Sequence, residues 1–175
     1  MKRLVSAIYL LTLCGSLAAA AKAWQLNSRG YGPVKVGMTI AEAESAMGTK
    51  LHTLDDQGNI SDRPPWDECD FVYPSKDSRV GVYMMVQGGR ISHISAKSKE
   101  IHTPSGVRLG DAASKIRRLF GARLEIEGHH YLDNAFYYFV WETNRHYGVK
   151  FEIVDDTVES IDAGDQTIML VEGCS

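Results

Sequence analysis

The densest group of side chains that could do chemistry is His129-His130-Tyr131, which follows Glu125 and Glu127. Imidazoles and carboxylates at this spacing could hold a metal ion or act as acid and base in a hydrolytic reaction. A metal site needs three or four converging ligands, however, and adjacent residues of an extended segment point to opposite faces. The chain has neither an HExxH pattern nor paired CxxC motifs. We therefore expect no metal or cofactor, with one histidine packed under the sheet and the other exposed.

Other catalytic patterns are equally weak. The sequence has no GxSxG motif, no phosphate-binding glycine loop and no dinucleotide fingerprint. Cys69 and a histidine could act as nucleophile and base, but a cysteine in an exported chain with one oxidised partner is more typical of a structural role. We assign no catalytic residue. An enzyme of the cell envelope, such as a hydrolase that uses the His129-His130 region, is the alternative hypothesis.

Aromatic side chains are concentrated in the expected loops and strands rather than in the expected helices. Residues 136–141 form a continuous apolar and aromatic run, so both sides of that strand must find cover. Half of these side chains belong to the core. The others either form an exposed patch for protein or glycan recognition or are covered by the C-terminal tail or the loop at 63–66. The candidate binding residues are Trp66, Tyr73, Tyr83, Tyr137 and Trp141.

These residues must be positioned by a pattern that occurs twice. Residues 36–48 and 109–121 each run from an apolar residue and a glycine through one helical segment to a second glycine. In the first copy Thr39 and Glu42 have the spacing of a capping box, and Gly48 is expected to end the helix. In the second copy, Asp111 or Ser114 is the expected cap and Gly121 the expected stop.

Three strand signals follow each helix, after a loop. They cover residues 69–73, 80–86 and 91–96 in the first copy, and residues 136–141, 147–153 and 158–163 in the second. Residues 80–96 align with residues 147–163 without a gap. The last two strands of each copy are joined by residues that accept hairpin dihedrals, Gly88-Gly89 and Asp155-Asp156. A further strand is expected at 167–171.

The sequence thus predicts an α+β protein. Two tandem helix-loop-three-strand repeats, residues 24–101 and 102–175, are expected to form one compact domain. They should share one antiparallel sheet with the helices on one face and the other face partly open to solvent.

Residues 1–23 have the features of a secretory signal peptide: two basic residues, a ten-residue apolar core and an alanine-rich end. Cleavage is expected after Ala20 or Ala23. The alternative is a lipid anchor on Cys14, but Leu13 stands before it where a bacterial lipobox has a small residue. We therefore expect a periplasmic or secreted protein.

Removal of residues 1–23 takes away three basic residues and shifts the formal net charge from −3 to −6. Such a balance argues against nucleic acid as a partner. A protein of the cell envelope or an extracellular protein is expected instead, and the membrane only if Cys14 is lipidated.

Two cysteines, Cys69 and Cys174, remain in the expected mature chain. An even number of thiols in an exported protein favours a disulfide between them. Two free buried thiols are the alternative.

The run Val36-Gly37-Met38-Thr39, continued to Gly48, resembles the signature of small exported bacterial domains of the outer-membrane assembly lipoprotein class (SmpA/OmlA type). It is also similar to the tandem domains of the β-lactamase-inhibitory protein family, in which two such units share one sheet. The second copy departs from the pattern, since it has Asp111-Ala112 where Met-Thr would stand. The resemblance implies a non-enzymatic protein-binding module, such as an inhibitor or an envelope assembly accessory.

Overall fold

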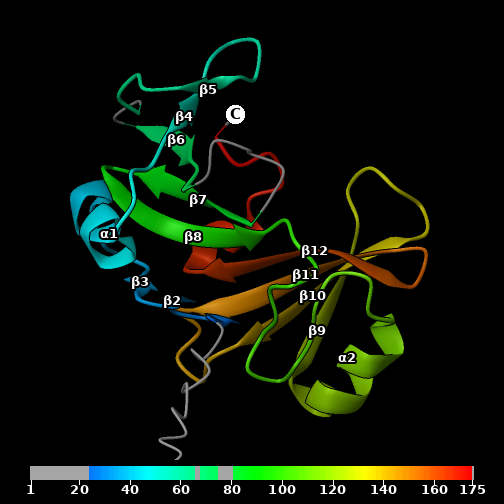
Figure 1. Ribbon diagram of the computed structural model, residues 1–175. Coiled ribbons are helices and arrows are strands. Elements are labelled where there is room, and N and C mark those ends of the chain that lie inside the picture. The colour runs from blue at the N-terminus through cyan, green and yellow to red at the C-terminus, as the bar shows by residue number, and fades with distance from the viewer. Residues whose placement is uncertain (1–23, 66–67, 75–80, 175) are drawn as a thin grey trace, which may run out of the picture.

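The computed structural model describes residues 24–65, 68–74 and 81–174. The expected signal peptide and the candidate residue Trp66 lie outside these ranges. One seven-stranded antiparallel sheet dominates the fold, in the strand order β6-β7-β8-β12-β11-β10-β9 (Figure 1). Its strands are β6 (Cys69–Val72), β7 (Val82–Gln87), β8 (Arg90–Ala96), β9 (Leu124–Gly128), β10 (Ala135–Trp141), β11 (Gly148–Val154) and β12 (Thr157–Gly164).

The remaining elements are small. They are β1 (Leu26–Asn27), β2 (Gly30–Tyr31) and β3 (Val34–Lys35), which form a sheet of their own; the pair β4 (Thr53–Leu54) and β5 (Ile60–Ser61); the helices α1 (Ile40–Met47) and α2 (Ala113–Phe120); and the 3-10 helices η1 (Gly121–Arg123) and η2 (Gln166–Met169). Within the described ranges neither helix has the length and hydrophobicity to cross a lipid bilayer.

The predicted α+β class, with two tandem helix-loop-three-strand repeats and the helices on one face of the sheet, is wrong, because the structure is mostly β. Each helix has only eight residues, so it covers a small part of the sheet. The rest of that face is covered by β1, β3 and the connection after β8. The halves are also unequal, since the second contributes a fourth strand, β9, that the sequence analysis did not predict.

The two halves nevertheless anchor their helices in the same way. Gly37 N donates to Ile91 O at 2.7 Å, and Ile91 N donates to Met38 O at 2.8 Å. In the second half, Gly110 N donates to Val158 O, and Val158 N donates to Asp111 O, both at 2.9 Å. The glycine before each helix therefore ties that helix to the start of the last strand of its own half.

The helix ends are only partly as expected. Thr39 and Glu42 form the predicted capping box, and Gly48 ends α1 in a left-handed conformation with φ of 68°. In α2 the predicted side-chain cap is absent: Ala112 occupies the cap position. The reason is that the Asp156 carbonyl accepts from Ala113 N at 2.8 Å, while Asp111 pairs with Lys115 instead. A backbone carbonyl thus does what a capping side chain would do.

A single core lies between the sheet and the helices. The sheet contributes alternate residues of each strand, among them Met84, Ile94, Tyr138, Phe151 and Ile161, all fully buried. Ala43 of α1 and Ile116 of α2 pack against them, together with Leu26 and Val34 from the small N-terminal sheet. Because these residues belong to one cluster, both halves are held by the same buried apolar surface.

The opposite face of the sheet is covered along its middle by the C-terminal segment, and not by the predicted strand at 167–171. That segment is the 3-10 helix η2 followed by irregular chain. Ile168 is fully buried against Tyr137 and Phe139, with Trp141 packed beside them. The apolar run at 136–141 needs cover on both sides. Of the two alternatives given above for its outer side chains, an exposed patch or cover by the tail, the tail covers Tyr137 and Phe139.

A disulfide fixes the end of this tail. Cys69 at the start of β6 and Cys174 are joined with a Cα–Cα separation of 5.3 Å. Just before it, Gly173 lies so close to the Phe71 ring that an added Cβ would be 2.6 Å from a ring carbon. The predicted bond is confirmed, and a disulfide of this kind is typical of exported proteins.

Removal of the disulfide should destabilise the protein without unfolding the sheet. The bond closes a loop of 105 residues, so the chain-entropy account predicts a loss of about 4 to 5 kcal/mol and a melting temperature lower by roughly 10 °C. Differential scanning calorimetry of Cys174→Ser and of the reduced protein should give the same decrease, with unchanged far-ultraviolet circular dichroism. Unchanged melting in both samples would show that the tail does not depend on the bond.

Candidate functional site

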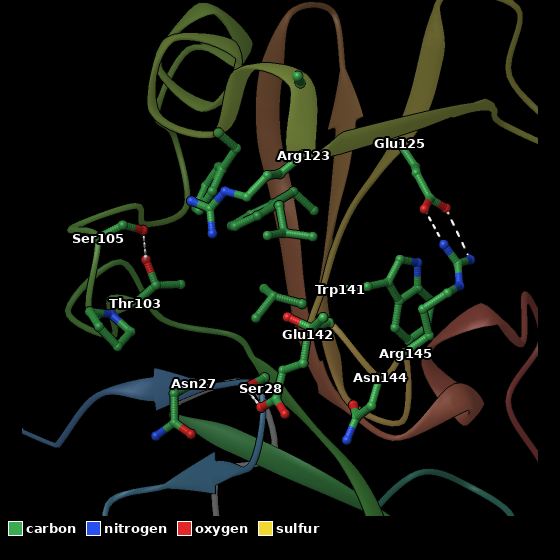
Figure 2. A pocket seen from close by; sticks show the side chains of 17 residues that line it. Asn27, Ser28, Thr103, Ser105, Arg123, Glu125, Trp141, Glu142, Asn144 and Arg145 are labelled. Atoms are coloured by element: carbon green, nitrogen blue, oxygen red, sulfur yellow. Dashed lines mark hydrogen bonds and ion pairs between the residues drawn. The ribbon is translucent and has the colours of Figure 1, made fainter.

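A cleft of about 870 Å³ lies at the junction of the two halves, with its floor on the helix-bearing face and part of its rim at the end of the β10–β11 hairpin (Figure 2). Four separate segments surround it: the β1–β2 turn, the loop at 103–105, the end of α2 with η1, and the β10–β11 hairpin. Its lining residues are Asn27, Ser28, Thr103, Pro104, Ser105, Phe120, Ala122, Arg123, Glu125, Val140, Trp141, Glu142, Thr143, Asn144, Arg145, Val149 and Phe151. We call this cavity the cleft.

The floor of the cleft is apolar. Val140 of β10 stands opposite Val149 of β11, and Phe151 lies two residues further along the same face. Phe120, the last residue of α2, packs on Phe151 with ring centroids 6.0 Å apart. Val140, Val149 and Phe120 are only partly buried, so they offer apolar surface to a ligand.

One side of the rim is fixed by an ion pair across the junction. Arg29 donates to both carboxylate oxygens of Glu142, at 2.9 Å and 2.5 Å, and Ser28 Oγ donates to Glu142 Oε1 at 2.7 Å. The Arg29 guanidinium also lies 4.6 Å from the centre of the Tyr147 ring. Hydrogen bonding from Arg29 lowers the pKa of Glu142. The carboxylate is therefore held ionised and fully paired, which makes it a poor proton donor or acceptor at neutral pH.

The other side of the rim is formed by Arg145, Glu125 and Trp141, drawn together in Figure 2. Arg145 makes a two-pronged contact with Glu125, whose hydrogen bond raises the pKa of the guanidinium. The same guanidinium lies 5.3 Å from the centre of the Trp141 ring. Arg145 has a left-handed φ of 55°, and this costly conformation for a side chain with a Cβ brings the guanidinium onto the indole.

Trp141 depends on a glycine in the neighbouring strand. Its register partner in β11 is Gly148, and an added Cβ there would lie 2.6 Å from the indole ring. The indole therefore lies flat over Gly148 and stacks on Phe139 at 5.8 Å with an interplanar angle of 6°. This packing holds Trp141 at the edge of the tail-covered face, where it also contributes to the rim of the cleft.

The candidate residues predicted from sequence do not come together at this site. Trp141 alone among them lines the cleft. Tyr73 and Tyr83 stack at 5.8 Å on the opposite face, and Tyr137 is buried under the tail. Apart from Trp66, which is not described, the set is divided between the cleft and the tail-covered face.

Sequence reasoning missed most of the cleft. Arg29 and Glu142 are separated by 113 positions, and no motif links the four segments. The left-handed turn at Arg145 also has no glycine to signal it. The apolar run at 136–141 was the one available signal, and it led only to Trp141.

A second cavity, of about 360 Å³, lies under the tail and is lined largely by polar groups. His129 lies here, with Nε2 at 3.1 Å from Glu152 Oε1, whereas His130 is exposed. Ser160 Oγ donates to the other oxygen of the same carboxylate at 2.9 Å. The carboxylate therefore stands between the serine and the histidine. A nucleophilic serine would need the imidazole as its neighbour instead.

The floor of the second cavity holds a buried ion pair. Lys150 Nζ lies 2.9 Å from Asp162 Oδ2, with side-chain exposures of 12% and 8%. Ser95 Oγ donates to Asp162 Oδ1 at 2.5 Å. Burial alone would raise the pKa of Asp162, but the charge on Lys150 and the hydrogen bond from Ser95 hold that pKa below its ordinary value. These contacts link β8, β11 and β12, and paired charges of this kind are typical of a structural role.

Comparison with known proteins gives little beyond this geometry. No protein-family model matches the chain, and no curated protein matches it. Among solved structures it is similar to the uncharacterized protein yfeY from Escherichia coli, with a TM-score of 0.44 and 14% identity, over 80% of this chain and 99% of that one. It is also similar to an extracellular protein containing a SCP domain from Bacillus anthracis, with a TM-score of 0.43 and 7% identity, over 77% of this chain and 45% of that one. Both TM-scores are below 0.5, and neither likeness indicates a function.

Breaking the Asp162–Lys150 pair should be costly. Asp162→Asn leaves the buried ammonium without its counter-ion, and we expect a loss of about 3 to 5 kcal/mol in the free energy of unfolding. A second substitution, Lys150→Met, should recover part of that loss. Lys50→Met, which removes an ion pair at an exposed position, should cost less than about 1 kcal/mol. Urea denaturation measures all four proteins, and an equal effect of Asp162→Asn and Lys50→Met would contradict the network.

The same pair predicts a pH dependence. Because the pKa of Asp162 is lowered in the folded state, its contribution to stability is present above the unfolded pKa of about 3.9 and is lost as the pH falls through the folded value. Urea denaturation between pH 7 and pH 2 should show this loss below about pH 4 in the native chain. The loss of stability at low pH should be smaller in Asp162→Asn. An equal dependence of the free energy of unfolding on pH in the two proteins would contradict this prediction.

Proposed function

We propose that this chain is an exported, non-enzymatic binding module that receives a short amphipathic segment of a partner protein in the cleft. The observation that supports this most directly is the combination of an apolar floor with a rim of paired charges. Ligand sites have this composition, and volumes of about 300 to 1,000 Å³. A partner segment would place apolar side chains on Phe120 and Val149 and polar groups against the rim.

The rim suits binding better than chemistry. Its two carboxylates, Glu125 and Glu142, are each engaged by an arginine. General acid or base catalysis needs a titratable group whose pKa lies near the working pH and that can reach the substrate. Groups held in bidentate pairs instead provide fixed charge and orientation.

The uncharged polar side chains of the cleft suit a protein partner. Side-chain amides and hydroxyls, such as those of Asn27, Ser105 and Asn144, also line the cleft. They can donate to and accept from the backbone of an extended segment without selecting a particular charge. An expected net charge of −6 after export also favours a protein partner over nucleic acid.

The enzymatic alternative places the reaction near His129 and His130. In the second cavity the imidazole of His129 is hydrogen-bonded to Glu152, and the tail lies over it. This arrangement supports a packing role for His129 rather than proton transfer to a substrate. A hydrolase that uses this region remains the competing hypothesis for the test below.

We also propose that the protein is located in the periplasm or outside the cell. The disulfide and the expected signal peptide together favour an oxidising compartment, the periplasm or the extracellular medium. The resemblance of residues 36–48 to envelope assembly lipoproteins and to β-lactamase-inhibitory proteins agrees with a role as an assembly accessory or an inhibitor.

Filling the cleft should abolish binding without loss of folding. Ala122 is exposed and lines the cleft, so Ala122→Arg introduces a long side chain above the floor. Peptides selected from a random phage-displayed library on the protein lacking residues 1–23 provide the probe, and fluorescence anisotropy measures their affinity. We expect Ala122→Arg to weaken binding by about tenfold or more.

Ala41→Arg is the matched control, because Ala41 is an exposed alanine of α1 that does not line the cleft. Its affinity should equal that of the native chain, and both variants should melt at the native temperature. Equal binding by the two variants, or a selection that enriches no peptide, would contradict the proposal.

A further inference from the structure

The two edges of the seven-stranded sheet differ. At the β6 edge, His52 and Tyr73 exchange both backbone hydrogen bonds, at 2.9 Å and 2.7 Å, so the short β4 segment covers the end of that edge. At the other edge, β9 pairs with β10 alone among the described strands. Residues 125–128 of β9 are all exposed. A strand edge in this state presents backbone donors and acceptors to a partner.

The register identifies the outward-facing groups. His129 N donates to Ala135 O at 3.0 Å, and the pairs of β9 and β10 continue from Gly128–Phe136 to Leu124–Val140. Hydrogen-bonded and non-bonded pairs alternate along an antiparallel ladder. Residues 125 and 127 therefore bond to β10, whereas the N–H and C=O groups of 124, 126 and 128 point away from the sheet.

The side chains along this edge have an alternating character. Ile126 stands opposite Tyr138 on the helix-bearing face and is 49% exposed, and the neighbouring Phe136 of β10 is 39% exposed. Glu125 and Glu127 project from the opposite face, as do their register partners Phe139 and Tyr137. One face of the edge is thus apolar, and the other carries the carboxylates of Glu127 and of Glu125, which is paired with Arg145.

We propose that the β9 edge takes up a strand of a partner protein in which basic and apolar residues alternate. This inference rests on the proposed function and specifies the partner. An added residue opposite Ile126 would place its side chain on the apolar face beside Ile126. The residues before and after it would face Glu125 and Glu127, where lysine or arginine is favoured over an acidic residue.

The same charges disfavour a second copy of this chain. Two β9 strands paired antiparallel about Ile126 would put Glu125 of one opposite Glu127 of the other. Like charges directly opposite one another destabilise a strand pair. The edge also begins at the cleft, because Glu125 and its partner Arg145 line the cleft rim. A segment that enters the cleft can therefore continue along β9.

The test uses a capped heptapeptide of alternating lysine and valine, added to the ¹⁵N-labelled protein lacking residues 1–23. Backbone amide shifts should change at 124, 126 and 128, the residues with outward-facing groups. The same peptide N-methylated at the alternate amides that face β9 should bind at least about tenfold more weakly, since it lacks those donors. A peptide of alternating glutamate and valine should not bind.

Variants then separate the edge from the cleft. Ile126→Pro removes an outward donor that the sheet does not use, which an edge strand tolerates, and it should abolish the shifts. Glu127→Lys should weaken the lysine peptide roughly fivefold. Glu159→Lys, the same reversal at an exposed position of β12, should leave its affinity unchanged. Unfolding of a variant is detected in the same spectra.

Three results would overturn the inference. They are equal binding of the N-methylated peptide, shifts confined to the cleft and lost only in Ala122→Arg, and a concentration-dependent dimer that Ile126→Pro abolishes. The second would leave the proposed function standing, because the cleft would then be the place where the peptide binds. If the selected peptides do not bind in the cleft but the amides of β9 still shift, the proposed function fails and the inference about β9 stands.

Discussion

The pairing of β8 with β12 at the centre of the sheet is the interaction on which the rest of the structure depends. Four residue pairs, from Ile161–Ala96 to Gly164–His93, join the two halves. The last pair needs a glycine, because a Cβ at position 164 would lie 2.4 Å from the Cβ of His93. Through this pairing the core becomes one cluster, and the cleft acquires one wall from each half. A shift of register here would move every side chain of one half to the wrong face.

Both faces of such a sheet must be covered, and two different solutions are used. The helix-bearing face is covered by short helices, a small sheet and connecting chain, which leave the cleft between them. The other face is covered along its middle by the tail, whose end is fixed by Cys69–Cys174. The buried pair of Asp162 and Lys150 lies under that tail. Hydrogen bonds to its polar atoms offset the cost of taking this pair out of water. No buried side-chain polar atom among the described residues lacks a partner.

Much of the sheet could be predicted from sequence because its signals are local. Alternating apolar residues and the turns at Gly88-Gly89 and Asp155-Asp156 placed six of the strands, and both turns have positive φ at both residues. The strand β9 was missed since Leu124–Gly128 is short, polar and exposed. The tail at 167–171 was predicted as a strand because its residues favour one, but burial of Ile168 in a 3-10 turn decided otherwise.

The cleft could not be predicted, because its residues are brought together by the sheet and not by a motif. Its rim also depends on Arg145 in a left-handed conformation, which composition does not signal. Likewise, the cap of α2 comes from the Asp156 carbonyl, which lies 43 positions from Ala113 in the numbering of the chain. Long-range contacts of this kind decide the site, whereas local patterns decide the strands.

The central claim is that the cleft at the junction of the two halves is where a partner segment binds. Hydrogen exchange of the protein lacking residues 1–23, with and without a saturating selected peptide, measures which backbone amides the bound peptide protects. The account predicts slower exchange in the loop at 103–106 and the turn at 142–146, with the tail at 166–173 unchanged. Protection confined to the tail and the face beneath it would contradict the account and move the binding surface to the opposite side of the sheet.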